Sequence, residues 1–305
     1  MKTHLLLCIG AALVWSCSQK STSVLSVAKD SPINYEIEEN GTKKLLGVVN
    51  EDGLSKSPYS EWFDKKNEYQ PASGVTPELA TALEDKQILA FFGSWCGDSK
   101  RHVPEFYSVL DAVNFDSDQL KVVAVNNKRD QYKKSPGGEE QGLNIHRVPT
   151  FIVYDKKGNE LGRIVESPVE TMEKDLLKIA SGEEYTENYH VVSLLDARLK
   201  LRGDDYIEKN FDMLVEGYEG LTASPSELNT YSYTKLFSGN RKLGKEITQL
   251  NHALHNTDYT LEKVVTPLIV DGELEKAASY IEAFKADHPD SEAVKKMEKL
   301  LASKN

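Results

Sequence analysis

The chain has 305 residues, of which 39% are hydrophobic and 28% are charged, and this composition excludes a disordered, collagenous or multi-span membrane protein. Its 48 acidic residues outnumber the 37 basic ones, and no Lys/Arg-rich run is present to neutralise nucleic-acid phosphates, so nucleic acid is excluded as a partner. The three cysteines, Cys8, Cys17 and Cys96, are too few for a disulfide scaffold and form no zinc-binding pattern. We expect no metal and no cofactor.

The amino terminus has the pattern of a secretory signal peptide. Basic residues precede an apolar stretch from Leu5 to Val14, which is shorter than the roughly 20 residues of a membrane-spanning helix. The tetrapeptide that ends at Cys17 resembles the lipobox of bacterial lipoproteins, in which the cysteine is lipidated and begins the mature chain. We expect residues 1–16 to be the signal peptide and residues 17–32 to be a flexible tether. A plain secretory signal and a buried apolar strand are the alternatives.

Residues 33–75 show only short apolar groups, and we predict an N-terminal extension packed on the next domain. Residues 76–182 carry the strong signals of an α/β domain, with continuous apolar runs of strand length. A last helix is predicted to begin at Ser167 and to end before Gly182. This order predicts a small sheet with helices on both faces. The other predicted elements are a helix at 76–83, a strand at 87–92, a helix after Asp98 bent or started near Pro104, a strand at 120–125, a surface loop at 126–141, and a hairpin of strands at 150–154 and 160–165.

Residues 183–305 lack strand signals, and their apolar residues recur at helical spacing, so we predict a second, all-helical domain. A faint repeat pairs Gly239 with Gly272 and resembles a tetratricopeptide-type helical hairpin. Pro267 is expected to interrupt one helix of the second copy. A plain helical bundle is the alternative. Such a domain either presents a docking surface to a protein partner or stabilises the fold as a cap.

Cys96 lies where the apolar strand at 87–92 gives way to a helix. Unpaired backbone N–H groups and the helix dipole favour a thiolate at this position. The following residues, Lys100, Arg101 and His102, add positive potential, whereas Asp98 opposes it. Cys96 is therefore a candidate nucleophile, and a buried structural thiol is the alternative.

Three landmarks arrive in the order typical of one family: the Trp95-Cys96-Gly97 segment, Pro104, and the Val148-Pro149-Thr150 segment. Roughly residues 76–181 thereby resemble the thioredoxin superfamily. The resemblance implies that Pro149 is a cis-proline facing Cys96 and that the backbone beside it pairs with substrate. It implies substrate-binding roles for Trp95, Gly97, Val148, Pro149 and Thr150. Together with the lipobox, the segment also resembles thioredoxin-family lipoproteins of Bacteroidetes-type bacteria.

Two departures from the family pattern limit the chemistry. Ser99 stands where the resolving cysteine of Cys-x-x-Cys is expected, which leaves a single-cysteine Cys-Gly-Asp-Ser site. Ser99 is predicted to donate a hydrogen bond to the Cys96 thiolate. Ala90 stands where thioredoxins bury an acidic proton acceptor, so protons must come from solvent or from a rim group such as His102, His146 or Glu105.

The remaining polar candidates are predicted to lie at the surface. His102 and His146 are expected to be exposed, and so is Arg147, with a role at the rim of the groove as its alternative. His252 and His255 have no acidic partners in helical register, and we interpret them as surface residues and not as metal ligands.

These observations lead to two hypotheses. The first is a lipid-anchored monothiol oxidoreductase or isomerase of the bacterial cell envelope, periplasmic or outer-membrane associated, in which Cys96 forms mixed disulfides with protein or small-molecule thiols. Its Cys17 acyl anchor would contact the bilayer. The second is a non-catalytic envelope module whose groove and helical domain bind a partner.

Overall fold

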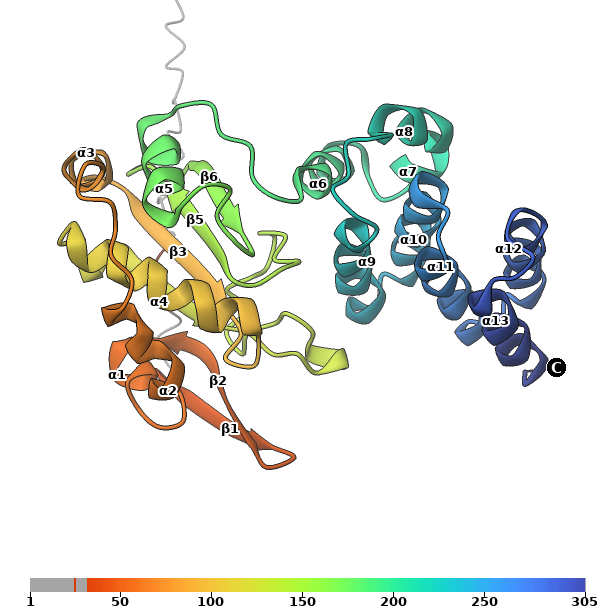
Figure 1. The fold of residues 1–305 in the computed structure, drawn as a ribbon, viewed down its shortest axis with the longest axis horizontal. Coiled ribbons are helices and arrows are strands. Elements are labelled where there is room, and N and C mark those ends of the chain that lie inside the picture. The colour runs from red at the N-terminus through yellow and green to blue at the C-terminus, as the bar shows by residue number, and fades with distance from the viewer. Residues whose placement is uncertain (1–24, 26–31, 305) are drawn as a thin grey trace, which may run out of the picture.

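The computed structural model describes Leu25 and residues 32–304. The predicted signal peptide, Cys17 and nearly all of the predicted tether lie outside these residues. Within the described part of the chain, every helix is too short or too polar to span a bilayer. An α/β domain comes first and is followed by a helical domain (Figure 1).

The α/β domain is built on a six-stranded sheet in the order β1-β2-β4-β3-β5-β6. Only β3 and β4 pair in parallel, while the other neighbours are antiparallel. The strands predicted at 87–92, 150–154 and 160–165 are confirmed, and the strand predicted at 120–125 ends one residue earlier. The six strands are β1 (Tyr35–Glu39), β2 (Thr42–Val49), β3 (Gln87–Phe92), β4 (Leu120–Ala124), β5 (Thr150–Tyr154) and β6 (Glu160–Val165).

Residues 33–75 pack on the domain as predicted, but they also contribute two strands to its sheet. In β1, Tyr35 and Ile37 alternate with glutamates, but the strand has only five residues and is largely exposed, so its signal is weak. β2 begins with polar residues and contains Gly47 at φ 76°, which weakens its pattern further. The rest of the segment forms α1 (Glu51–Leu54), α2 (Ser60–Phe63) and the 3-10 turn η1 (Asp64–Asn67).

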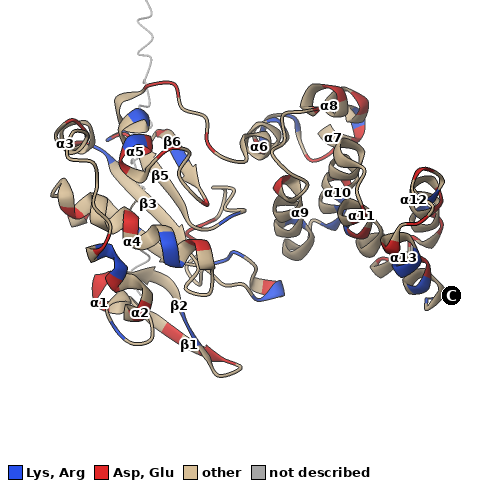
Figure 2. Ribbon diagram, viewed as in Figure 1, with Lys and Arg blue, Asp and Glu red and all other residues tan. Residues whose placement is uncertain are grey.

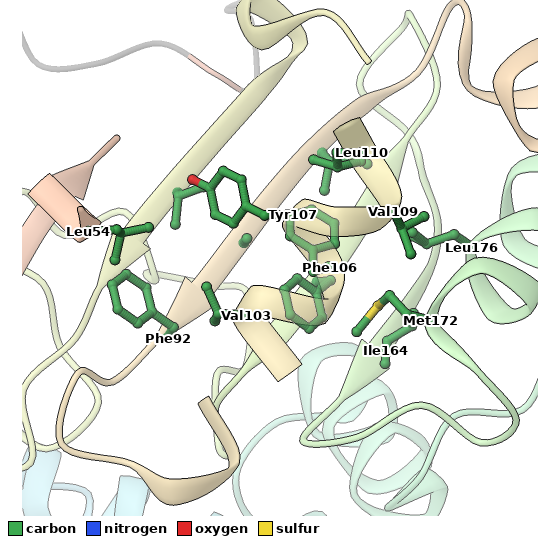
Figure 3. Close-up of a cluster of buried hydrophobic side chains, with 14 of the residues drawn as sticks. Leu54, Phe92, Val103, Phe106, Tyr107, Val109, Leu110, Ile164, Met172 and Leu176 are labelled. Atoms are coloured by element: carbon green, nitrogen blue, oxygen red, sulfur yellow. The ribbon is translucent and has the colours of Figure 1, made fainter. Parts of the chain in front are cut away.

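The prediction of helices on both faces of the sheet was wrong. One core cluster joins the inner residues of β3 and β5 to three helices, α3 (Thr76–Leu83), α4 (Gly97–Ala112) and α5 (Met172–Ser181). Figure 3 shows Phe106 of α4 beside Val109 and close to Ile164 and Met172 of this cluster. The opposite face is covered by residues 126–149, which we call the 126–149 loop. This segment buries Ile145 and Val148.

Local interactions explain why the 126–149 loop is irregular and why α5 begins later than predicted. The loop contains Pro136 and three glycines, and its regular structure is limited to the 3-10 turn η3 (Arg129–Gln131). α5 begins at Met172 instead of Ser167, because the Asp175 carboxylate accepts hydrogen bonds from the N–H groups of Val169 (2.6 Å) and Glu170 (3.1 Å). These bonds hold residues 167–170 in a turn. α4 begins at Gly97, well before Pro104.

The described residues after Gly182 contain helices and no strands, as predicted. Gly239 and Gly272, the residues paired by the predicted repeat, each follow the first helix of a helical pair and have positive φ values of 98° and 76°. Pro267 does not interrupt α11, which continues to Val270. The helices are α6 (His190–Arg202), α7 (Tyr206–Lys209), α8 (Phe211–Tyr218), α9 (Ser226–Ser238), α10 (Arg241–His255), α11 (Asp258–Val270), α12 (Leu274–Asp287) and α13 (Glu292–Ala302).

His252 is buried, which corrects the prediction that it lies at the surface. Its Nδ1 is 3.0 Å from the Thr260 hydroxyl, and burial lowers its pKa to about 4. His255 is half-buried, and its Nε2 is 3.0 Å from the Thr222 hydroxyl. No group of metal-binding side chains occurs among the residues that the structure describes. His252 therefore contributes to the contact between α10 and α11.

Gly244 allows α9 and α10 to approach closely. A Cβ added there would lie 2.6 Å from Leu236 Cγ and 2.8 Å from the Leu236 backbone nitrogen. We expect Gly244→Ala to lower the free energy of unfolding by about 1–3 kcal/mol, because overpacking displaces one helix from the other. Gly217→Ala is the matched control, since Gly217 lies in α8 with open space around it, and alanine should stabilise that helix. Urea denaturation of both variants tests this, and equal effects would contradict it.

Candidate functional site

Cys96 is held at the junction between β3 and α4. The Cys96 N–H donates to the Gly93 carbonyl at 2.8 Å and closes the turn that follows the strand. Cys96 then caps α4 with extended backbone angles, φ −90° and ψ 132°. The thiol-bearing residue is half-buried and Gly97 is exposed. The sulfur therefore sits at the edge of the domain and not inside its core.

The segment before β5 lies against this junction. The Val148–Pro149 peptide bond is cis, as predicted. The Cys96 thiol donates a hydrogen bond to the Val148 carbonyl, with Sγ 3.3 Å from the oxygen. The side chains of Val148 and Thr150 are buried, and the Thr150 hydroxyl donates to the Arg147 carbonyl at 2.8 Å. At Val148 it is thus the backbone, and not the side chain, that faces the sulfur.

Ser99 is not bonded to Cys96, contrary to the prediction. Its side chain is fully buried, and its Oγ accepts a hydrogen bond from the Gly93 N–H at 3.1 Å. On the other side of the turn, Ser94 Oγ accepts from the Leu45 N–H of β2 at 3.1 Å. The two serines therefore hold the turn that carries Cys96, and Ser99 acts on the thiol only through the backbone.

Lys133, in the 126–149 loop, is a site residue that the sequence analysis missed. Its side chain is 7% exposed, and its Nζ lies 5.0 Å from the ring centre of Trp95 and 4.9 Å from that of Tyr132. Trp95 itself is held by its indole N–H, which donates to the Val125 carbonyl at 2.8 Å. Burial lowers the pKa of Lys133 to about 8, while the nearby Cys96 opposes this shift. Sequence offered no signal, because Lys133 belongs to a charged loop typical of a solvated surface.

Arg147 is buried, although a surface position was predicted. Its Nη1 donates to both carboxylate oxygens of Glu166, at 2.7 and 2.9 Å. Its Nη2 donates to the Ser226 carbonyl at 2.9 Å, and its guanidinium lies 3.8 Å from the ring centre of Tyr189. Glu166 also bonds the Tyr189 hydroxyl. This cluster joins the turn before Pro149 to the helical domain.

The histidines predicted at the rim are buried as well. Burial lowers the pKa of His146 to about 3, so its imidazole is neutral at physiological pH and cannot serve as a proton donor to a leaving thiolate. His102 is also buried, with Nδ1 2.6 Å from Glu105 Oε2. Glu105 is the third rim group proposed for proton transfer, and unlike the two buried histidines it lines an open cleft.

That cleft lies beside the amino terminus of α4 and has a volume of about 490 Å³. One wall comes from residues 62–69 and the other from α4, so the N-terminal segment helps to shape the approach to Gly97. Lys65 comes from one wall and Lys100 and Arg101 from the other, and the carboxylates of Glu68 and Glu105 lie among them, so the charge of the cleft is mixed. Its lining consists of Trp62, Lys65, Glu68, Tyr69, Gly97, Lys100, Arg101, Pro104 and Glu105.

Residues 64–179 match a family model described as thioredoxin. This domain is thioredoxin-like. No curated protein matches the chain. A solved structure of a protein of unknown function from Pseudomonas aeruginosa is 18% identical, with 40% of this chain and 81% of that chain covered and a TM-score of 0.31. An HIV epitope-scaffold is 17% identical, with 41% and 83% covered and a TM-score of 0.31.

The thioredoxin-like domain departs from the usual chemistry at the two positions identified from sequence. Ala90 is buried in β3 within the core cluster that contacts α4, so this position holds no proton acceptor. Ser99 is buried as well, and Cys96 is the free cysteine of the described residues. Exchange chemistry at this position would therefore have one sulfur within the described residues.

We expect Ser99→Ala to destabilise the domain without changing the reactivity of Cys96. The substitution leaves the buried Gly93 N–H without its acceptor, which costs about 1–3 kcal/mol of unfolding free energy. Urea denaturation and the rate of Cys96 alkylation by iodoacetamide measure the two effects. Ser279→Ala, at an exposed serine of α12, is the control. A large change in alkylation rate with unchanged stability would instead indicate a direct contact between hydroxyl and thiol.

We expect Lys133→Met to stabilise the protein near neutral pH. Burial disfavours the ammonium, so the folded chain releases this proton at about pH 8 and the unfolded chain near pH 10.5. The free-energy cost of burying the Lys133 ammonium is therefore complete below pH 8, and it disappears as the pH rises towards 10.5. Removing it should raise the free energy of unfolding by about 1–3 kcal/mol at pH 7.

Urea denaturation at pH 7 and pH 10 checks this expectation, with Lys134→Met as the control. Lys134 is its half-buried neighbour in the chain. A gain that persists at pH 10 would show that packing and not charge is responsible.

Proposed function

We propose that the protein exchanges disulfides through Cys96 as a monothiol oxidoreductase or isomerase. The observation that supports this most directly is the placement of a half-buried thiol at the amino terminus of α4, with Sγ 3.3 Å from the Val148 carbonyl. The exposed backbone N–H groups of a helix terminus stabilise a thiolate. The Lys133 ammonium lies beside Trp95 and adds positive potential.

In the proposed reaction, the Cys96 thiolate attacks one sulfur of a substrate disulfide. The new Cys96–substrate disulfide forms as the old sulfur–sulfur bond breaks, and the second substrate sulfur leaves as a thiolate that takes a proton from solvent or a rim group. Because no resolving thiol follows at Ser99, release requires attack by another thiol. Attack by a further thiol of the same substrate returns Cys96 and rearranges the substrate disulfide with no net oxidation or reduction. Isomerisation therefore suits this site better than net reduction.

The proposed location is the bacterial cell envelope, with Cys17 lipidated and the folded part held at the periplasmic side or at the outer membrane. The support comes from the lipobox-like sequence, which lies outside the described residues. Disulfides persist in such a compartment and are scarce in the cytosol. The proposed partners are therefore envelope proteins or small thiols with disulfides, and the bilayer through the Cys17 acyl chain.

A non-catalytic binding module is the second candidate. Two buried residues favour it. Ser99 stands where a second thiol would be needed for turnover, and Ala90 stands where a buried acid would be needed. A domain with these substitutions keeps the Val148 backbone beside Cys96 and would bind a partner without turnover. The two candidates differ in whether the sulfur of Cys96 is required.

Trapping of a mixed disulfide tests the proposed function. Full-length protein with Cys8→Ser and Cys17→Ser keeps Cys96 as its single thiol, and we expect it to react with an aromatic disulfide faster than glutathione does at pH 7. The same protein with Cys96→Ser is the control. Absorbance of the released aromatic thiolate gives the rate, and mass spectrometry gives the adduct. A thiol that reacts no faster than glutathione would remove the support for exchange and leave the binding module.

A further inference from the structure

Aromatic rings and cations alternate along the faces of α9 and α11. Lys263 Nζ lies 4.9 Å from the ring centre of Tyr259 and 5.8 Å from that of Tyr233. Tyr233 stacks on Phe237, with 5.2 Å between the ring centres and 18° between the planes. Two rings of α9 and one of α11 are thus connected through one lysine. Such a surface offers flat apolar contacts with a positive charge between them.

The series continues into the 126–149 loop and reaches the candidate site. Arg129 lies 4.9 Å from the ring centre of Phe237, and Tyr132 meets the same ring edge-on at 5.6 Å. Tyr132 is followed by Lys133, which also lies over Trp95, the neighbour of Cys96. In Figure 1 the yellow-green loop between β4 and β5 extends towards the end of α9. We call this series, from Tyr259 to Trp95, the ring–cation line.

The cations of this line are not neutralised by carboxylates. In the part of the chain that the structure describes, Lys263, Arg129 and Lys133 form no ion pair with an acidic side chain. Figure 2 shows Lys and Arg colour at the end of the loop that points towards α9. The whole chain carries a net charge of -11, so this positive strip stands out against its acidic surroundings. Arg129 is exposed and Lys263 is half-buried, so both can pair with an incoming anion, whereas Lys133 is buried and only adds positive potential.

A hollow of about 240 Å³ lies along the line between α9 and α11. Arg129, Tyr233, Phe237 and Lys263 contribute to its lining, together with apolar surface from Pro267 and Val270. Its lining also includes Glu262, which is paired with Lys296, and Arg241, which is paired with Asp271. The volume admits a few side chains of a peptide and not a folded domain. Its unpaired charges are positive.

We propose that the ring–cation line binds an extended acidic segment of a substrate protein and so brings that protein's disulfide to Cys96. The delivery of a disulfide to Cys96 rests on the proposed function, whereas the binding of the acidic segment does not. Acidic side chains pair with Arg129 and Lys263, and the apolar or aromatic residues between them stack on the rings. Since the contacts lie at intervals along a strip, the ligand is an extended chain.

Peptide binding to a thiol-free protein tests the docking alone. The full-length chain with all three cysteines replaced by serine is titrated with a fluorescent peptide that contains alternating Glu and Phe residues, and anisotropy reports binding. We expect the peptide to bind more tightly than its Glu→Gln counterpart and to bind more weakly as salt rises. Lys263→Glu and Arg129→Glu should each weaken binding about fivefold. Arg129 is exposed, so its substitution removes the contact with Phe237 at the surface and leaves the buried core clusters intact.

Lys276→Glu is the matched control, because Lys276 is exposed on α12, away from the line, and the charge change is identical. It should leave the affinity unchanged. Equal affinity for the acidic and amide peptides, or equal losses in the Lys263 and Lys276 variants, would overturn the proposal.

Exchange kinetics separate this proposal from the proposed function. In protein that keeps Cys96, Lys263→Glu should slow reaction with a disulfide-linked acidic peptide about fivefold and leave reaction with a small neutral disulfide unchanged. If both disulfides react and the substitution slows neither, docking is wrong and exchange stands. If the peptide binds as expected but neither disulfide reacts, exchange is wrong and docking stands.

Discussion

The buried Arg147 guanidinium is the interaction on which the arrangement of the site depends. It bonds both oxygens of Glu166 at the end of β6 and the carbonyl of Ser226 at the start of α9, and it lies on the face of Tyr189. A charge this far from water must keep its partners, because removing one leaves the other uncompensated in a medium of low polarity. Arg147 stands two residues before Pro149. The same side chain therefore fixes the turn that faces Cys96 and the position of the helical domain.

This arrangement determines which groups surround the single thiol of Cys96. The thioredoxin-like domain has no second sulfur at Ser99 and no buried acid at Ala90. In their place, the 126–149 loop brings Lys133 over Trp95, and its tip meets Phe237 of α9 through Tyr132. The surroundings of the thiol thus come from a loop and a second domain as well as from the domain that carries the cysteine. We infer that partner choice is determined there.

The elements that sequence predicted best are those whose signal is local. β3, β5, β6 and α3 have the predicted bounds, because continuous apolar runs and short helical repeats reflect burial directly. β1 was missed because it is a short, exposed edge strand in which only Tyr35 and Ile37 mark the alternation. The start of α5 was misplaced because the Asp175 carboxylate, from within the helix, bonds the N–H groups before it. His146, Arg147 and His252 were assigned to the surface because polar residues usually lie there, and tertiary packing buries each of them.

By itself, the sequence determined that one cysteine follows a buried strand and begins a helix, that Ser99 cannot resolve a mixed disulfide, and that an all-helical segment follows. Each of these depends on the order of neighbouring residues along the chain. Only the tertiary structure decided that Ser99 bonds Gly93, that Lys133 lies over Trp95, and that rings and cations continue from there to α11. These contacts join segments far apart in sequence, and they arise only when the 126–149 loop packs between the sheet and α9.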